Sequence, residues 1–257
     1  MATPLVLRVA EGDARRYRRS WRGSVITSFV NPALYLVAMG LGLGTLVDAG
    51  PAGFADITYL EFLAPGLLAA TAMQTGVGDG SWPVLAGHKW LKTYYATLAT
   101  PITVHGLATG HLVWVGVRVA FVSLVFVGMM ALFGATSVWL GLLALFPALL
   151  TGLAFAAPAS AYAAWLDDAP GLATLFRFGV VPMFLFSGTF FPITQLPAWL
   201  QPLAYVTPLW HGVALCRAIA LQVEPPLAWG VHVAYLLMWV VVGLGLAFFF
   251  FRRRLVH

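Results

Sequence analysis

Six long apolar stretches constrain this chain more than any other feature of its sequence. A transmembrane helix needs about 20 such residues to cross roughly 30 Å of hydrocarbon. With 61% hydrophobic and 9% charged residues, the sequence is too apolar for a soluble domain. We therefore expect an all-α, polytopic membrane protein in which residues 1–257 form a single transmembrane domain. The six predicted spans are residues 24–46, 58–78, 107–133, 137–164, 171–191 and 228–251.

The basic residues predict the orientation of these spans. An even number of spans places both termini on one side, and Lys and Arg favour the cytoplasmic side. With cytoplasmic termini, twelve of the fourteen basic residues lie inside, Arg217 lies outside and Arg118 lies within a span. The inner set is Arg8, Arg15, Arg16, Arg18, Arg19, Arg22, Lys89, Lys92, Arg177 and Arg252 to Arg254, and the outer acidic set is Asp48, Asp56, Glu61 and Glu224. The pattern predicts a multi-pass protein of the inner (cytoplasmic) membrane, and it explains the net charge of +5 without a nucleic-acid partner.

An amphipathic helix is predicted before the first span, within residues 1–23. Its apolar face comprises Val6, Ala10, Ala14, Tyr17 and Trp21. The arginines point elsewhere, and Asp13 interrupts the pattern slightly. This arrangement is typical of a helix that lies on the membrane surface. The alternative is a disordered basic tail that only sets orientation. No cleavable signal peptide is expected, because the apolar run that follows is too long.

The region between the fifth and sixth spans, residues 192–227, is apolar but contains four prolines, at 192, 197, 202 and 208. Proline removes a backbone hydrogen bond from a helix interior. Thr207 and Pro208 predict the N-cap and first residue of a helix that reaches Leu221. At 1.5 Å per residue this helix is about 22 Å long, too short to span. We therefore expect short interfacial or re-entrant helices on the outer face, followed by span 228–251 and a cytoplasmic tail, 252–257.

Residues suited to intramembrane catalysis are sparse. Ser187 and His232 are the available nucleophile and base, and the sequence has neither a Gly-x-Ser-x-Gly nor a His-Glu-x-x-His motif. Both side chains are more simply explained as polar packing groups. Cys216 is the only cysteine, so an internal disulfide and a thiol metal cluster are excluded. We expect neither an enzyme nor a metal site.

An ion-coupled secondary transporter is the alternative from another class. Such carriers place acidic or histidine side chains deep in the bundle. The nine acidic residues here fall near predicted span ends or in loops. Arg118 is the one charge well inside a span, and it shares a helix face with His111 and Trp114. This face either contacts a pathway or an anionic lipid headgroup, or Arg118 pairs with a neighbouring helix.

Three blocks of sequence carry a family resemblance: "YLEFLAPGLLAATAM" (59–73), "YYATLATPITVHGLATGHL" (94–112) and "FLFSGTFFPITQLPAWLQPLAYVTPLWHGVALCRAIAL" (184–221). The last block is the most specific in order and spacing. With the basic helix that precedes the first span, they resemble the membrane subunit of type-2 ABC exporters. This permease family includes polysaccharide, nodulation-factor and drug exporters, and the resemblance covers nearly the whole chain. The chain has no Gly-x-x-x-x-Gly-Lys-[Ser/Thr] phosphate loop, so any ATP must bind to another polypeptide.

The resemblance implies an ATP-driven exporter with two permeases in the membrane and two ATPase subunits below. ATP and Mg would reside on the ATPase subunits, and this chain needs no cofactor of its own. The substrate would be lipidic, a glycolipid or an amphiphilic drug, and the sequence does not choose among them. The second permease would be another copy of this chain or a related one. The proline-rich block would form an outer gate from Phe191, Pro192, Pro197, Trp199, Pro202, Tyr205, Pro208 and Trp210.

The resemblance also implies that the segment between the second and third spans contacts the ATPase. The expected coupling residues are His88, Lys89, Trp90, Lys92, Tyr94, Tyr95, Thr100 and Pro101. The charge pattern places this segment in the cytoplasm, where clustered aromatic side chains indicate a partner surface. The alternative is an aromatic belt at the lipid interface. Thr100 and Pro101 predict the N-cap and first residue of the third spanning helix.

Overall fold

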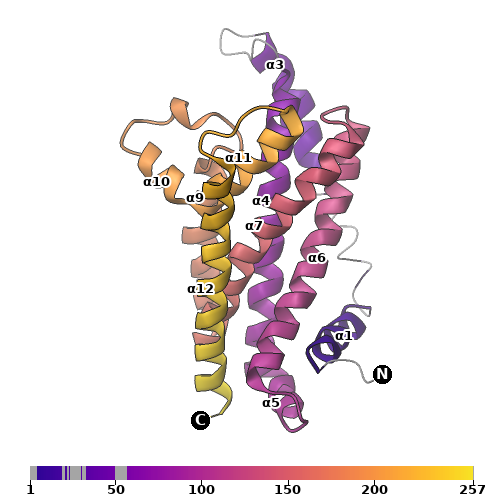
Figure 1. Ribbon diagram of the computed structural model, residues 1–257, viewed down its shortest axis with the longest axis vertical. Coiled ribbons are helices and arrows are strands. Elements are labelled where there is room, and N and C mark those ends of the chain that lie inside the picture. The colour runs from indigo at the N-terminus through magenta and orange to yellow at the C-terminus, as the bar shows by residue number, and fades with distance from the viewer. Residues whose placement is uncertain are drawn as a thin grey trace.

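The computed structural model describes residues 5–18, 33–49 and 57–256, together with Trp21, Gly23 and Val30. Every regular element in these residues is a helix, which confirms the predicted all-α class (Figure 1). The first elements are α1 (Leu5–Tyr17), η1 (Leu36–Leu43), α3 (Gly44–Asp48), α4 (Tyr59–Leu85), η2 (Ala86–Trp90), α5 (Thr93–Leu98), α6 (Val104–Leu132) and α7 (Val138–Trp165). They are followed by α8 (Ala169–Thr174), η3 (Leu175–Val180), α9 (Val181–Phe186), η4 (Ile193–Gln195), α10 (Gln201–Val206), α11 (Pro208–Leu221) and α12 (Trp229–Leu255).

Four helices of the described chain are long and apolar enough to cross a membrane: Val104–Leu132, Val138–Trp165, Ala169–Phe186 and Trp229–Leu255. They confirm the last four predicted helical segments to within a few residues. The second predicted segment, 58–78, is also helical, but α4 continues to Leu85. An apolar helix over Ala33–Asp48 is shorter, and the start of the predicted 24–46 span lies outside the described residues, as do Arg19, Arg22 and Asp56. The total of six spans therefore stays a prediction.

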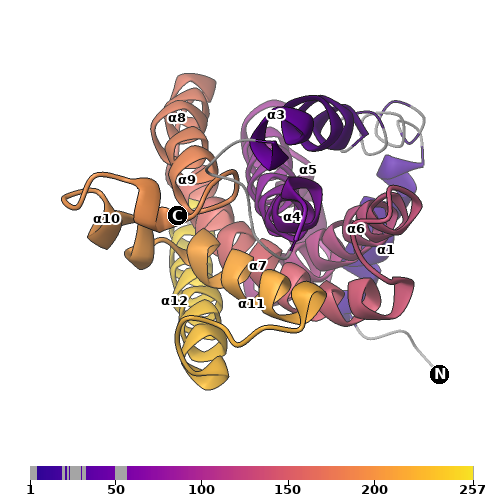
Figure 2. The same cartoon turned by 90° about the horizontal axis from the view of Figure 1, so that it is seen from above.

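Helix α4 lies at the centre of the bundle, against α6, α7 and α11 (Figure 2). Its closest approach is to α7, where a Cβ added to Gly76 would lie 2.1 Å from the carbonyl oxygen of Gly152. One turn later, a Cβ on Gly80 would lie 2.8 Å from the carbonyl oxygen of Ala156. Small residues at this spacing let two helix backbones touch. The Gly76/Gly80 pair therefore serves packing within the chain.

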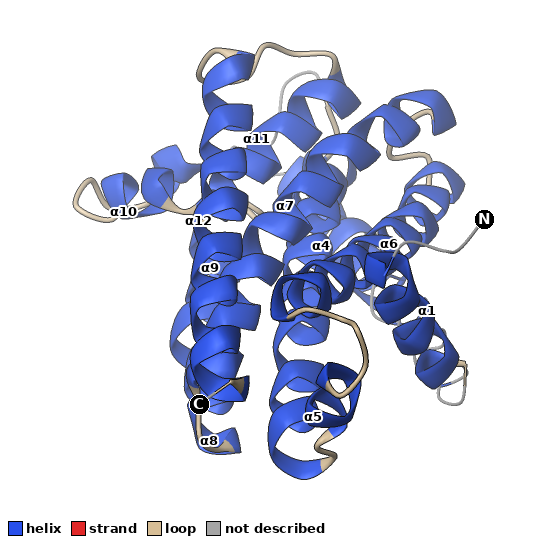
Figure 3. Ribbon diagram, turned by 60° about the horizontal axis from the view of Figure 1, so that its bottom comes forward, coloured by secondary structure: helices blue, strands red, loops and turns tan. Residues whose placement is uncertain are grey.

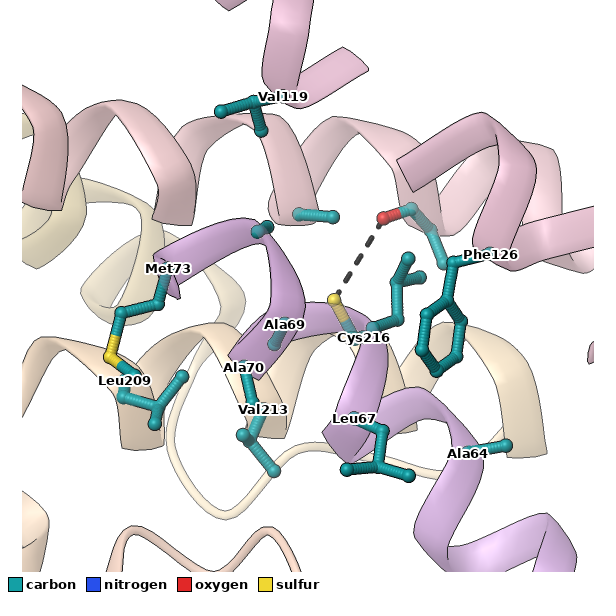
Figure 4. Close-up of a cluster of buried hydrophobic side chains, with 14 of the residues drawn as sticks. Ala64, Leu67, Ala69, Ala70, Met73, Val119, Phe126, Leu209, Val213 and Cys216 are labelled. Carbon is teal, nitrogen blue, oxygen red and sulfur yellow. Dashed lines mark hydrogen bonds between the residues drawn. The ribbon is translucent and has the colours of Figure 1, made fainter. Parts of the chain in front are cut away.

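The largest core cluster includes side chains from α4, α6 and α11 (Figure 4). Met73 of α4 lies beside Leu209 of α11, and Phe126 of α6 is fully buried. The thiol of Cys216 in α11 donates to the carbonyl oxygen of Ala144 in α7, at 3.8 Å. The short helix of the proline-rich region is thus part of the core.

The bundle has two distinct ends. Helices α1 and α5 and the C-terminal end of α12 lie toward one end, and α3 and α10 lie toward the other (Figure 1). We call the first the inner end, after the cytoplasmic side that the charge pattern predicts, and the second the outer end. The predicted coupling residues lie at the inner end and the predicted gate residues at the outer end.

Candidate functional site

The predicted coupling segment is a short helical hairpin at the inner end, between α4 and α6. Helix α4 passes directly into the π-helical segment η2, which ends at Trp90. The chain then turns at Lys92, whose left-handed backbone has a φ of 52°, and α5 begins at Thr93. The turn brings the two halves of the segment side by side, with α5 at the tip of the bundle (Figure 3).

The coupling segment has a buried side and an exposed side. Tyr94 is only 3% exposed, and its ring packs against Phe251 of α12 with centroids 5.8 Å apart. Burial also raises the pKa of the Tyr94 hydroxyl. On the other side, Leu91 is 65% exposed, Trp90 53% and Tyr95 44%. Tyr94 therefore holds the segment in place, and the other three residues form its exposed apolar surface.

His88 and Lys89 face the end of α7. The Nε2 atom of His88 donates to the carbonyl oxygen of Ala163 at 3.2 Å, and Lys89 donates to the carbonyl oxygen of Asp167. Burial lowers the pKa of His88; the hydrogen bond to Ala163 opposes this effect, and the positive charge of Arg254 adds to it. His88 is therefore a neutral hydrogen-bond donor at neutral pH.

The predicted start of the third helix at Thr100 and Pro101 is wrong. Helix α6 begins at Val104, and its N-cap is Thr103, whose hydroxyl accepts a hydrogen bond from the Gly106 amide at 3.1 Å. Thr100 instead donates to the carbonyl oxygen of Thr97 at 2.6 Å, which closes the end of α5. A threonine hydroxyl can serve either a preceding carbonyl or a following amide, so the sequence signal alone was ambiguous.

The polar face of α6 is covered by α1 and paired with α4. Arg118 lies 3.1 Å from the carboxylate of Asp79 in α4 and donates to the hydroxyl of Tyr17 in α1 at 2.6 Å. Its guanidinium also stacks on the Tyr17 ring, 4.2 Å from the centroid, and Trp114 contacts the same ring. Arg118 is 7% exposed, so this structure shows the paired arrangement rather than a charge facing an open pathway.

Asp13 makes a buried contact that sequence reasoning missed. The sequence suggested that it interrupts the apolar face of α1, but it is buried, pairs with Arg16 and lies 3.5 Å from Nδ1 of His111. Burial raises the pKa of Asp13, but His111 and Arg16 together hold it below its ordinary value of 3.8. The docked face of α1 is thus centred on Val9 and Asp13.

The docking of α1 is close enough to leave a defined cavity beside it. A Cβ added to Gly110 would lie 2.6 Å from the carbonyl oxygen of Val6, so α1 rests directly on the α6 backbone. The cavity measures about 340 Å³, and Asp13, His111 and Arg118 line it, together with residues of η2. The face that includes His111, Trp114 and Arg118 therefore lies at the junction of α1, α4 and α6.

At the outer end, prolines begin the short helices. Thr207 caps α11 by accepting from the Trp210 amide at 3.3 Å, and Pro208 is the first residue, which confirms the predicted start. Pro202 occupies the first turn of α10, and Pro192 precedes η4. Proline is compatible with these positions because the first amides of a helix have no partner within it. The Thr207 hydroxyl is also 2.8 Å from that of Ser187, which ties α11 to the end of α9.

The predicted gate aromatics divide into exposed and buried groups. Trp199 is 71% exposed and Tyr205 39%, so these two rings lie on the surface. Trp210 is only 7% exposed and packs edge-on against Tyr205, with centroids 4.9 Å apart, so it is one of the buried gate residues. Phe191 and Pro192 line an apolar cavity of about 580 Å³ between η1, α9 and the start of α4.

Two polar groups of the outer end carry contacts that the sequence did not reveal. Arg217 donates to the carbonyl oxygens of Gly188 at 2.9 Å and Phe62 at 3.3 Å, and its guanidinium lies 3.7 Å from the Phe62 ring centroid. His211 and His232 face each other with their Nδ1 atoms 2.9 Å apart. Arg217 could have been noticed in the sequence, because a charged residue stands out in an apolar run. The histidine pair gives no sequence signal, because His211 and His232 come from different helices.

Ser187 and His232, the two side chains considered for catalysis, do not hydrogen-bond to each other but to other residues. Ser187 hydrogen-bonds to Thr207, and His232 hydrogen-bonds to His211. This geometry supports their interpretation as packing groups.

Comparison with known proteins matches residues 6–221 to a family described as ABC-2 type transporter. Nodulation protein J of Rhizobium meliloti (strain 1021) is 29% identical over 248 residues, which cover 94% of this chain and 92% of that protein. Nodulation protein J of Sinorhizobium fredii (strain NBRC 101917 / NGR234) is 30% identical over 251 residues, covering 94% and 92%. The inner membrane transport permease YadH of Escherichia coli (strain K12) is 23% identical over 248 residues, covering 91% and 92%.

Proposed function

Because the chain belongs to the ABC-2 type transporter family, we propose that it is the membrane-spanning subunit of an ATP-driven exporter whose ATP is hydrolysed by a separate subunit. Its family and its long apolar helices both indicate a membrane-integral permease. The observation that carries the proposal is the exposed apolar surface of Trp90, Leu91 and Tyr95 at the inner end. Exposed aromatic clusters of this kind mark partner surfaces.

In the proposed assembly, two ATPase subunits bind at the inner end of two permease copies. ATP and Mg remain on the ATPase subunits and supply the energy for transport. This chain contributes the contact surface, which is held by buried Tyr94, while exposed Lys92 offers a positive charge beside it. The second permease is another copy of the chain unless a related permease is co-expressed.

The inner end is proposed to face the cytoplasm. Arg8, Arg15 and Arg252 to Arg254 lie on the elements found there, α1 and the end of α12. The outer end then faces away from the cytoplasm, with the proline-rich region as its gate. Basic residues on the cytoplasmic side follow the general rule for multi-pass proteins.

The proposed substrate has an apolar part and moves outward, as expected for a lipid, a glycolipid or an amphiphilic drug. The apolar cavity at the outer end supports this class of substrate, since aromatic side chains such as Tyr35, Phe184 and Phe190 line it. Ligand cavities are commonly apolar with a few polar groups, and Gln195 supplies one here.

The central test is association with an ATPase. The tagged chain, purified from its native host, should bring down a polypeptide with a phosphate-binding loop and ATPase activity. Trp90→Ala combined with Tyr95→Ala should weaken this association by at least about thirtyfold, because truncating even one aromatic hot spot commonly costs about 2 kcal/mol. Trp139→Ala is the matched control, since Trp139 is 68% exposed but lies in the first turn of α7. Transport by the purified chain with an ion gradient and without any ATPase would overturn the proposal.

The orientation is tested by cysteine labelling in a Cys216→Ser background. A cysteine at Ala198 should react with a membrane-impermeant reagent added from outside, and a cysteine at Leu91 should react only after the membrane is opened. Both positions are exposed, so accessibility reports the side of the membrane rather than burial. The opposite pattern would reverse the orientation.

A further inference from the structure

The C-terminal turn of α7 receives side chains from two distant segments. From α12, Arg254 donates to the carbonyl oxygens of Trp165 at 2.7 Å, Leu166 at 2.9 Å and Ala164 at 3.0 Å. From η2, His88 donates to Ala163 and Lys89 donates to the carbonyl oxygen of Asp167. Together, His88, Lys89 and Arg254 occupy the carbonyl oxygens of five consecutive residues, 163–167. We call these three side chains the α7 clamp.

The clamp satisfies a general need of helix ends. The last four carbonyl groups of an α-helix have no partner within the helix, and cations are favourable there because of the helix dipole. In many helices a C-terminal glycine and the turn that follows it meet this need. Here the donors come from residues about 75 to 90 positions away in sequence, so the end of α7 is held by other helices.

The carbonyl contacts matter more than the ion pair in the same place. Arg254 also lies 2.7 Å from the carboxylate of Asp167, which lowers the pKa of that carboxyl group. The Asp167 side chain is 86% exposed, however, and exposed ion pairs contribute little. Arginine suits the carbonyl role because its planar group donates in several fixed directions at once, which a lysine ammonium does not.

The clamp joins the coupling segment to three helices of the bundle. Its first two members belong to η2, which leads directly into the exposed surface of the coupling segment. The helix end that it holds leads into α8 after only residues 166–168, and α8 begins the next apolar helix. Arg254 adds the end of α12. A few side-chain contacts therefore connect η2 to the end of α7, to the start of α8 and to α12.

We propose that the α7 clamp is the junction that carries movement of the coupling segment into the membrane helices, with Arg254 as its central positioning residue. This inference rests on the proposed function, because an ATPase supplies the movement. The clamp is assigned to the transmission step and not to ATPase docking, since Arg254 lies in α12 and its donors point to the end of α7.

The test separates transmission from docking. Arg254→Ala should retain ATPase association but lower the substrate transported per ATP hydrolysed by about tenfold. Arg254→Lys should restore part of the loss, and Asp167→Asn should have little effect. Arg252→Ala is the matched control, because Arg252 lies in the same last turn of α12 and its side chain forms no hydrogen bond or ion pair recorded in the described part of the chain. Equal coupling in Arg254→Ala and Arg252→Ala would overturn the inference, as would loss of ATPase association in Arg254→Ala.

A second measurement does not need the ATPase. Nitroxide labels on cysteines at Leu91 and Asp168, both exposed, report the distance across the clamp in a Cys216→Ser background. Arg254→Ala should broaden the distance distribution, whereas Arg252→Ala should leave it narrow. If the unmodified chain recruits no ATPase, the proposed function fails. The distance measurement still tests the clamp in that case, and equal distance distributions in Arg254→Ala and Arg252→Ala would overturn the inference.

Discussion

The outer segment 192–221 and the inner segment 86–103 both interrupt the long helices, yet they are held in different ways. The outer segment ends in α11, which packs among α4, α7 and α12 and buries most of its residues. The inner segment consists of η2 and α5, which pack less extensively against the long helices and leave Trp90, Leu91 and Tyr95 exposed. One segment has become part of the core, and the other projects from it.

This difference separates a surface used by the chain itself from one left for a partner. At the outer end, prolines and a threonine cap shape the backbone locally, and the resulting helix α11 is buried among the long helices. At the inner end, one buried ring and a few long polar side chains hold the segment against distant helices. Regions with few buried contacts open at lower free energy than the core. The inner segment is therefore the part of this chain best suited to move.

The largest expected effect tests how much of the inner segment depends on one ring. Tyr94→Ala should destabilise the inner end by about 3 kcal/mol or more, the usual result of emptying a buried aromatic site. Its neighbour provides the control, because Tyr95 is 44% exposed and Tyr95→Ala should cost less than about 0.5 kcal/mol. Denaturant unfolding in detergent, combined with hydrogen exchange over 86–98, measures both. Equal losses of stability in the two variants would contradict the division of the coupling segment into a buried side and an exposed side.

The next effect tests whether α11 belongs to the core. A Cβ added to Gly212 would lie 2.1 Å from the hydroxyl oxygen of Thr151 in α7, so Gly212→Ala should cost about 1 to 3 kcal/mol. Gly230→Ala in α12 is the control, since a Cβ there meets nothing within 4 Å. Adding Thr151→Ala to Gly212→Ala should recover part of the loss. An unfolding midpoint in Gly212→Ala equal to that of Gly230→Ala would mean that α11 is not tightly packed.

The local features of these segments were more predictable than their packing. The N-cap at Thr207 and the first residue Pro208 follow from residue types alone, because a cap depends on a few adjacent residues. The long apolar helices are equally local signals. Thr100 and Thr103 show the limit: two threonines stood near one helix start, and only the surrounding fold determines which hydroxyl serves the amide.

The site contacts depend on residues far apart in sequence, so the sequence did not reveal them. In the sequence, Asp13 only interrupts an amphipathic pattern, and the fold shows that His111 lies beside it. Arg254 is one of three adjacent arginines in the sequence, and only the fold shows that it binds the end of α7. Tyr94 and Tyr95 are chemically identical neighbours, and only packing against Phe251 tells them apart. Periodicity identifies which residues are apolar, but it does not identify their partners.

A smaller effect compares equivalent caps at the two ends. Thr207→Ala should cost about 2 kcal/mol, because Thr207 caps α11 and also contacts Ser187 and the carbonyl oxygen of Ala204. Thr103→Ala should cost about 1 kcal/mol, since Thr103 is exposed and its hydroxyl serves as the cap by accepting from the Gly106 amide. Thermal unfolding of the two variants measures the difference. A larger loss at Thr103 would contradict the view that the outer segment is the more integrated one.

The smallest effect is a pH dependence at the inner end. The folded-state pKa of His88 lies below its ordinary value of 6.5, mainly because the ring is buried, with Arg254 and Lys89 contributing in the same direction and Asp167 opposing them. Protons therefore bind the unfolded state more readily, so the stability from neutral His88 is present above pH 6.5 and is lost as the pH falls toward the folded pKa. The Asp167 carboxyl group, whose pKa is lowered from 3.8, does not titrate in this interval.

Hydrogen exchange of residues 86–98 measures this pH dependence. The exchange should accelerate, relative to its intrinsic rate, as the pH falls below 6.5. His88→Gln should abolish the acceleration, because glutamine keeps a hydrogen-bond donor but does not titrate. The same pH response in His88→Gln would assign it to another group and leave the inner segment's attachment independent of His88.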